Sequence, residues 1–180
     1  MAVVAHYDTA PGTVGATDNA SGVAVLLELA RLFKTIERDY SVDFIAFGAE
    51  EFRGTGAKEY AKKHKKEFKN ISLCWNMDCL GTVLGRNILQ VRKARKMADI
   101  LKREFPDVHV EHFDAPGGHD ARVFSENKVP VVYFHTQWDQ FPQIHSPNDN
   151  LTRINFNKLA DMCEISFHIL KDFFVRFYTN

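Results

Sequence analysis

Seven histidine and acidic residues stand at the ends of apolar segments of this chain or in the loops that follow them. They are His6, Asp8, Asp18, Glu50, Glu51, Asp78 and His145. A set of imidazole and carboxylate groups without a thiolate suits Zn²⁺, Co²⁺ or Mn²⁺ holding a reactive water, whereas structural zinc sites favour cysteine. The sequence therefore indicates a catalytic metal site.

The number of candidate ligands bears on the number of metals. Two histidines and three carboxylates are too many for one tetrahedral metal, but they fit two metals that share a bridging carboxylate. One glutamate is then left over as a general base. Two other interpretations are a Ca²⁺ or Mg²⁺ site, against which the histidines argue, and ordinary acids, with Asp18 capping a helix and Asp8 starting a turn.

These residues need elements that bring them together. Apolar patterns predict strands at residues 2–5, 41–47, 71–77, 87–91, 108–113 and 129–134, helices at 19–36, 57–68, 92–105 and 156–178, and a short helix after the turn at 116–120. Strands that alternate with helices favour an α/β sandwich with a largely parallel or mixed sheet. Ligands of such sheets bind at the carboxyl ends of the strands, so the candidates are expected along one edge.

Composition favours a single domain, residues 1–180. A chain of 180 residues with 45% hydrophobic residues can build one sizeable core but is short for two. Its 23 basic and 23 acidic side chains cancel without forming a basic stripe, which argues against nucleic acid as a partner. Glu28 and Arg31 interrupt the most hydrophobic predicted helix, so we expect no membrane-spanning segment.

The cysteines bear on the cellular compartment. Cys74, Cys79 and Cys163 are too few for a disulfide framework, and the N-terminus shows no signal-peptide pattern. These features indicate a reducing compartment, the cytoplasm, although a removed leader would leave no trace in this sequence. The sequence leaves the oligomeric state open.

The motifs resemble those of the co-catalytic zinc aminopeptidases of peptidase family M28. The resemblance rests on HYD at residues 6–8, GATDNASGV at 15–23, GAEE at 48–51, Asp78, and HSPND at 145–149, in the family's order. It implies a three-layer α/β/α sandwich with a mixed, largely parallel sheet, as in zinc exopeptidases. It also implies hydrolysis of the N-terminal peptide bond of peptides with a free N-terminus.

The resemblance assigns a role to each candidate residue. The implied ligands of two zinc ions are His6 and Asp78 on one ion, Glu51 and His145 on the other, and Asp18 as the bridge. Asp8 would accept the free N–H of His6 and fix its tautomer. Glu50 would be the general base that takes a proton from the bridging water.

Three features depart from the family pattern. Members carry a helix and one or two strands before the first ligand, so we expect a sheet that lacks those N-terminal strands. Residues 117–119, Gly-Gly-His, replace a Ser-Asp-His turn, so a supporting carboxylate is missing or is supplied by Asp120. No tyrosine is clearly placed to stabilise an oxyanion, and Tyr133, His135 and Trp138 are the candidates.

The loop at residues 136–144 is predicted to wall the substrate site, because it joins a strand end to His145. Trp138 and Phe141 would form an apolar wall, and Asp139 would pair with the substrate's α-amine or be solvated.

Two rival functions share this fold. A glutaminyl cyclase, a transferase with one zinc, resembles the sequence at GATD and at the paired glutamates. The tract EEFRGTG at residues 50–56 and Ile144, where cyclases carry an aromatic, argue against it. A non-catalytic binding scaffold is the second rival, but such domains lose ligands that this chain keeps.

Overall fold

The computed structural model describes residues 1–114, 118–136 and 143–173. The strands in this part of the chain are β1 (Ala2–His6), β2 (Asp43–Phe47), β3 (Cys74–Met77), β4 (Asn87–Arg92), β5 (His109–Phe113) and β6 (Val131–Thr136). The helices are α1 (Ser21–Phe33), α2 (Thr55–Lys63), α3 (Arg95–Glu104), α4 (His119–Glu126) and α5 (Phe156–Lys171), with short helical turns η1 (Ala16–Ala20), η2 (Phe68–Asn70) and η3 (Leu151–Arg153).

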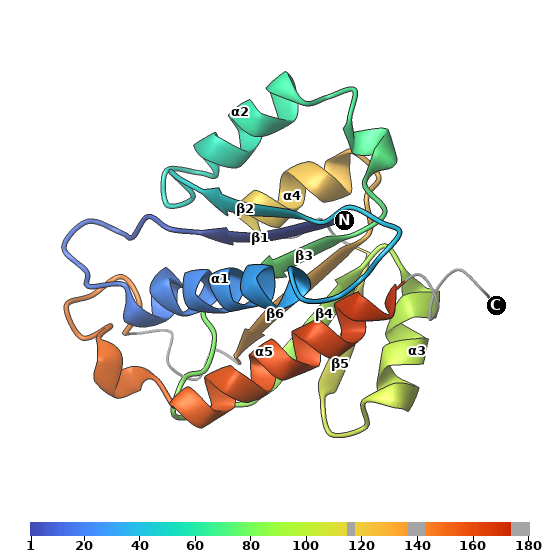
Figure 1. Ribbon diagram of the computed structural model, residues 1–180. Helices are drawn as coiled ribbons and strands as arrows, with labels where there is room; N and C mark the ends of the chain where they lie inside the picture. Colours follow the sequence, from blue (N-terminus) through green and yellow to red (C-terminus); the bar gives the residue numbers. More distant parts are fainter. Residues whose placement is uncertain (115–117, 137–142, 174–180) are drawn as a thin grey trace.

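One six-stranded sheet runs through the molecule in the order β2-β1-β3-β6-β4-β5 (Figure 1). Strands β2, β1, β3 and β6 are parallel, whereas β4 and β5 are parallel to each other and antiparallel to β6. The prediction of a mixed, largely parallel sheet is therefore confirmed. The carboxyl ends of the four parallel strands meet at one edge of the sheet.

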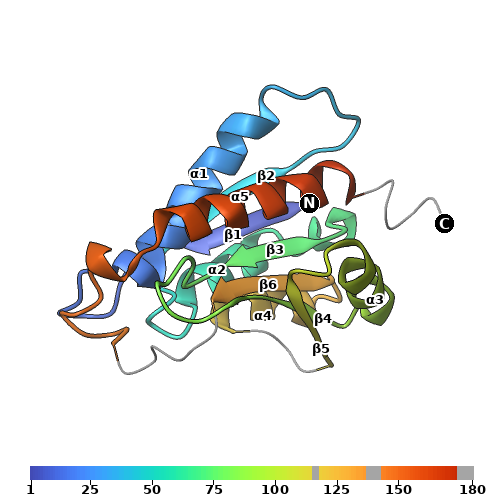
Figure 2. The same ribbon diagram turned by 90° about the horizontal axis from the view of Figure 1, so that it is seen from below.

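Helices cover the sheet on both faces, which confirms the three layers (Figures 1 and 2). Alternate residues of β1 point to opposite faces. Val3 and Ala5 join the larger core with α1, α3 and α5, and Ala2 and Val4 join the smaller core with α2 and α4. In the larger core, the side chain of Leu29 is completely buried, which stabilises the fold by about 1.5–3 kcal/mol.

The predicted elements are present, but several of their ends differ. The helix expected from residue 19 begins at Ser21, because the backbone angles of Asp18 (φ −113°, ψ 86°) and Asn19 (φ −141°, ψ 39°) are not helical. The helix expected to reach residue 68 ends at Lys63 and is followed by η2. The final helix begins at Phe156 as predicted and is described to Lys171.

None of the described helices combines the length and the apolar character that a bilayer crossing needs. All three cysteines are free and buried.

Candidate metal centre

The candidate residues lie at the carboxyl ends of the parallel strands. His6 ends β1, the two glutamates follow β2, and Asp78 follows β3. The chain leaves β1 through α1 on one face of the sheet and leaves β2 through α2 on the other (Figure 1). From β1 the chain continues to β2 on one side of the sheet, and from β3 it continues to β4 on the other, so the direction of the strand connections changes between β1 and β3. Ligands of α/β sheets bind at such a switch point.

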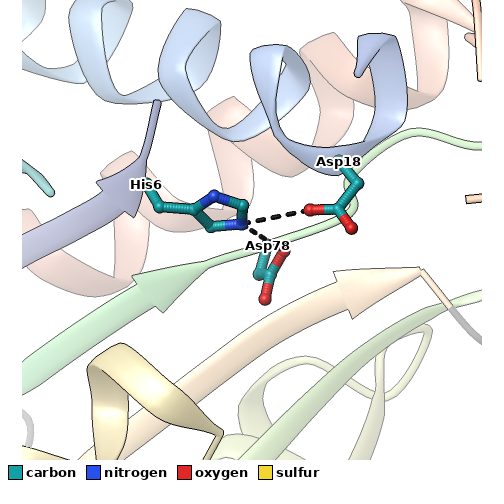
Figure 3. A group of neighbouring side chains, drawn as sticks. All are labelled: His6, Asp18 and Asp78. Atoms are coloured by element: carbon teal, nitrogen blue, oxygen red, sulfur yellow. Dashed lines mark hydrogen bonds and ion pairs between the residues drawn. The ribbon is translucent and has the colours of Figure 1, made fainter. Parts of the chain in front are cut away.

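The first set of converging side chains comes mainly from strand ends, and we call His6, Asp18 and Asp78 the strand group (Figure 3). His6 Nε2 lies 3.1 Å from Asp18 Oδ1 and 3.3 Å from Asp78 Oδ1. The side chains of His6 and Asp18 are only 3% and 7% exposed. The strand group is thus preassembled in a buried position.

The second set comes from loops, and we call Asp18, Glu51 and His145 the loop group. His145 Nε2 lies 3.0 Å from Asp18 Oδ2 and 3.2 Å from Glu51 Oε1. The side chain of His145 is 51% exposed, and its backbone adopts a left-handed φ of 57°. Asp18 belongs to both groups and gives a different oxygen to each.

Both groups fit a zinc ion by the type and spacing of their donor atoms. Zinc bonds of 2.0–2.2 Å in a tetrahedron place neighbouring ligand atoms about 3.3–3.6 Å apart. The distances from each histidine nitrogen to its carboxylate oxygens, 3.0–3.3 Å, are close to that separation. One imidazole and two carboxylates per group, with one carboxylate shared, match a two-metal site with room for water or substrate.

The electrostatics of the strand group also favour a cation. Burial lowers the pKa of His6, but hydrogen bonds to Asp18 and Asp78 outweigh it and raise the pKa to about 12. Burial opposes ionisation of Asp78, yet the hydrogen bond to His6 leaves its pKa lowered. The carboxylates thus draw positive charge to His6 Nε2, the atom that would face a metal.

Asp8 fixes the paired glutamates more directly than it fixes His6. Its carboxylate accepts hydrogen bonds from the backbone N–H groups of Glu50 (3.0 Å) and Glu51 (3.2 Å). His6 Nδ1 is 3.0 Å from the Asp8 backbone carbonyl and 3.7 Å from the Asp8 carboxylate. The histidine is therefore oriented by the main chain of Asp8, which differs from the expected carboxylate contact.

Glu50 belongs to neither group, although it is the neighbour of Glu51 in the chain. Burial raises the pKa of Glu50 to about 7, and the charge of Asp78 adds to the rise. The charge of His6 acts in the opposite direction, and a bound cation would do the same. Glu50 is thus close to the charges of the centre without being one of its donors.

Tyr133 contacts the candidate ligand Asp78. Its buried hydroxyl donates to Asp78 Oδ2 at 2.7 Å, which leaves Asp78 Oδ1 facing His6. The hydroxyl therefore orients Asp78, and its suggested role in stabilising an oxyanion stays a prediction. His135 is buried beside the Tyr133 ring. Trp138, Asp139 and Phe141 lie outside the described residues.

Asp120 lies behind the centre, in the first turn of α4. Burial raises its pKa to about 8, and repulsion by the charge of Glu50 adds to the rise. Among the described residues neither of its carboxylate oxygens has a hydrogen-bond partner. Asp120 therefore lies near enough to Glu50 for their charges to interact, but its carboxylate supports none of the described residues by a hydrogen bond.

Two polar residues that sequence reasoning gave no role in the centre hold its segments together. Asp149 accepts hydrogen bonds from the backbone of Thr17 (2.8 Å) and Asp18 (3.0 Å). Asn19 accepts from the N–H of Gly22 (3.0 Å) and donates to the carbonyl of Met77 (3.0 Å). The only sequence signal for Asp149 was its place in the HSPND motif.

Gly22 is required by this packing. A Cβ at Gly22 would lie 2.4 Å from Asn19 Oδ1 and 2.8 Å from the Met77 carbonyl oxygen. The second glycine of the GATDNASGV motif thus lets the start of α1 approach the end of β3.

Comparisons with known proteins agree on one family. The family model described as Peptidase family M28 matches residues 1–170. Aminopeptidase YwaD of Bacillus subtilis (strain 168) is 44% identical over 81 residues, which are 44% of this chain and 18% of YwaD. The solved structure of BSAP, a zinc aminopeptidase from Bacillus subtilis, is 27% identical with a TM-score of 0.81, over 95% of this chain and 45% of the BSAP chain.

A relative of another kind is the BOS complex subunit NCLN of Mus musculus. It is 33% identical over 135 residues, which are 60% of this chain and 24% of NCLN. The chain therefore spans less than half the length of each of these three relatives.

Proposed function

The chain belongs to peptidase family M28, and we propose that it acts as a metal-dependent aminopeptidase that removes the N-terminal residue of peptides. The observation that carries the proposal is the pair of three-residue donor groups that share Asp18, with Glu50 beside them. The names of YwaD and BSAP, an aminopeptidase and a zinc aminopeptidase, support it.

The proposed cofactor is a pair of zinc ions, with Co²⁺ or Mn²⁺ as alternatives. His6 and Asp78 would hold one ion, Glu51 and His145 the other, and Asp18 both. Bound ions of this kind lower the pKa of a water molecule and polarise the scissile carbonyl. His6 would give up its Nε2 proton to bind a cation there, because a histidine ligand is neutral.

Glu50 is the proposed general base. Its carboxylate takes a proton from the attacking water and passes it to the nitrogen of the leaving amine. Water is thereby added across the peptide bond, which yields a free amino acid and a shortened peptide. The role is assigned from position, because Glu50 interacts with the charges of the centre but is a donor in neither group.

Asp8 supports this division of labour between the glutamates. Its carboxylate binds both backbone N–H groups, so the turn that presents Glu50 and Glu51 is fixed to the end of β1. Glu51 then faces Asp18 and His145, and Glu50 lies beside the donor groups, near enough to interact with their charges.

A non-catalytic scaffold is the second candidate function, and the similarity to a complex subunit favours it. Against it, this chain carries both donor groups and Glu50 together. A glutaminyl cyclase with one zinc is the third candidate. The presence of two donor groups argues against it, because a single-zinc site needs only one of them.

The proposed setting is the cytoplasm or another reducing compartment. All three cysteines are free and buried, an arrangement that suits a protein without a disulfide framework.

Assays on amino-acid anilides and short peptides with Zn²⁺, Co²⁺ or Mn²⁺ test the proposed function. We expect release of the N-terminal residue from unprotected peptides, a large loss of this activity on N-acetylated peptides, and two metals per chain. Glu50→Gln is the matched control, because it keeps the size of the side chain and removes the base. Ammonia release from N-terminal glutamine with one zinc per chain would identify a cyclase. No turnover of any substrate by the metal-loaded protein would contradict an enzyme and favour the scaffold.

A further inference from the structure

Asp18 has the most demanding geometry in the centre, because its two oxygens face different groups. Oδ1 lies 3.1 Å from His6 Nε2 and Oδ2 lies 3.0 Å from His145 Nε2. A small rotation of this carboxylate would move both oxygens at once. The residues that fix the backbone around Asp18 therefore decide how well each group is formed.

The segment before Asp18 is tied to the loop that carries His145. Both carboxylate oxygens of Asp149 accept backbone hydrogen bonds, from Thr17 at 2.8 Å and Asp18 at 3.0 Å. The backbone carbonyl of Asp149 accepts a third, from Ala16 at 3.2 Å. Asp149 is 1% exposed, so its carboxylate is shielded from bulk solvent. These contacts join two of the three chain segments of the loop group, those that carry Asp18 and His145.

The segment after Asp18 is tied instead to the end of β3. The amide of Asn19 donates to the carbonyl of Met77 at 3.0 Å and accepts from the N–H of Cys79 at 3.3 Å. These two residues flank Asp78. Asn19 is completely buried and also accepts from the N–H of Gly22 at 3.0 Å, which fixes its amide orientation. These contacts join the two chain segments that carry Asp18 and Asp78.

We propose that Asn19 and Asp149 are positioning residues that act on opposite halves of the centre. Asn19 holds Asp18 in register with the strand group, and Asp149 holds it in register with the loop group. The inference rests on the proposed two-metal site but does not depend on peptidase activity. Its test is therefore a metal-binding measurement, and a failure to hydrolyse peptides leaves that measurement intact.

Two nearly isosteric substitutions test the division. Asp149→Asn keeps the shape but places an N–H₂ group against one of the two backbone donors. Asn19→Asp keeps the acceptor and removes the donor to the Met77 carbonyl. Each is made in a His145→Ala background, which leaves the strand group, and in a His6→Ala background, which leaves the loop group. The readout is the Zn²⁺ dissociation constant from competition with a chelator, on the full chain.

In the His145→Ala background we expect Asn19→Asp to weaken Zn²⁺ binding by roughly 10–100-fold, as removal of a ligand's support does, and Asp149→Asn to change it little. In the His6→Ala background the two effects exchange. Ser166→Ala is the matched control, because Ser166 is equally buried but bonds only within α5, and it should change neither constant.

Equal weakening of Zn²⁺ binding by both substitutions in both backgrounds would overturn the proposal. It would show that Asn19 and Asp149 both support Asp18 without acting on separate groups. The melting temperature of the metal-free variants shows whether each still folds. Where an isosteric variant does not fold, Asn19→Ser and Asp149→Ser repeat the comparison. Unfolding of both versions at one position would show that the residue supports the whole domain, which also contradicts the proposal.

Discussion

The two halves of the metal centre are built from different parts of the fold. In the strand group, His6 and Asp78 come from the ends of neighbouring strands β1 and β3, and the side chain of His6 is 3% exposed. In the loop group, the side chain of His145 is 51% exposed, and this residue lies within a loop and not at the end of a strand. The sheet thus sets the geometry of the strand group, whereas the loop group needs additional hydrogen bonds between chain segments.

Polar side chains make those hydrogen bonds to backbone groups. Asp8 joins the end of β1 to the turn of Glu50 and Glu51, and Asp149 joins the His145 loop to Asp18. A charged acceptor makes such hydrogen bonds stronger than neutral ones. The comparison indicates that a loop can present a ligand to a rigid site when carboxylates accept backbone hydrogen bonds from a neighbouring chain segment.

The substitution Asp18→Ala would break both halves and should have the largest effect. Because Asp18 gives one oxygen to each group, its removal leaves each ion with two donors from the chain. We expect metal content to fall from two per chain to none by elemental analysis. His145→Ala serves as the control and should lose one metal. Two metals retained in Asp18→Ala would rule out the bridging role.

Glu50→Gln separates chemistry from metal binding in both halves. Loss of the general base should lower kcat by roughly 10²–10⁴-fold, the usual contribution of such assistance. The metal content should remain at two, because Glu50 is in neither donor group. Turnover near that of the unaltered protein would show that another group accepts the proton.

Tyr133→Phe should affect the strand group alone. The hydroxyl donates to Asp78 Oδ2 at 2.7 Å, and removal of such support lowers metal affinity by roughly 10–100-fold. The measurement is the Zn²⁺ dissociation constant in the His145→Ala background. The same substitution in the His6→Ala background should leave the constant unchanged. Equal weakening of Zn²⁺ binding there would show that Tyr133 stabilises the packing of the whole domain and not the strand group alone.

The order of metal loss is the smallest expected difference between the halves. A chelator should remove the metal of the loop group first, because His145 is half exposed and is held by a loop. Release followed with a chromogenic chelator should have two phases, and His145→Ala should remove the fast one. A fast phase that persists in His145→Ala would place the more labile ion in the strand group.

Much of the fold follows from local patterns. Short apolar segments predicted the six strands, and their alternation with helices predicted the layers, because burial on two faces leaves a signal in each segment. The same patterns placed His6 and Asp78 at strand ends. The start of α1 was predicted two residues too early, because Asn19 turns its side chain to Met77 and Cys79 instead of entering the helix.

The supporting residues of the centre were harder to predict from the sequence. Asp149 binds backbone groups more than 130 residues away, and the Tyr133 hydroxyl reaches Asp78 across neighbouring strands. Such contacts depend on tertiary geometry and leave no periodic pattern. The division of the candidates between two metals came from the resemblance to the family, because residue types alone do not tell which carboxylate is shared.

The central claim is that two metals share Asp18, and anomalous diffraction at the zinc edge from crystals grown with zinc tests it most directly. The account predicts two peaks, one among His6, Asp18 and Asp78 and the other among Asp18, Glu51 and His145, with one oxygen of Asp18 on each. A single peak, or two peaks of which only one contacts Asp18, would contradict it.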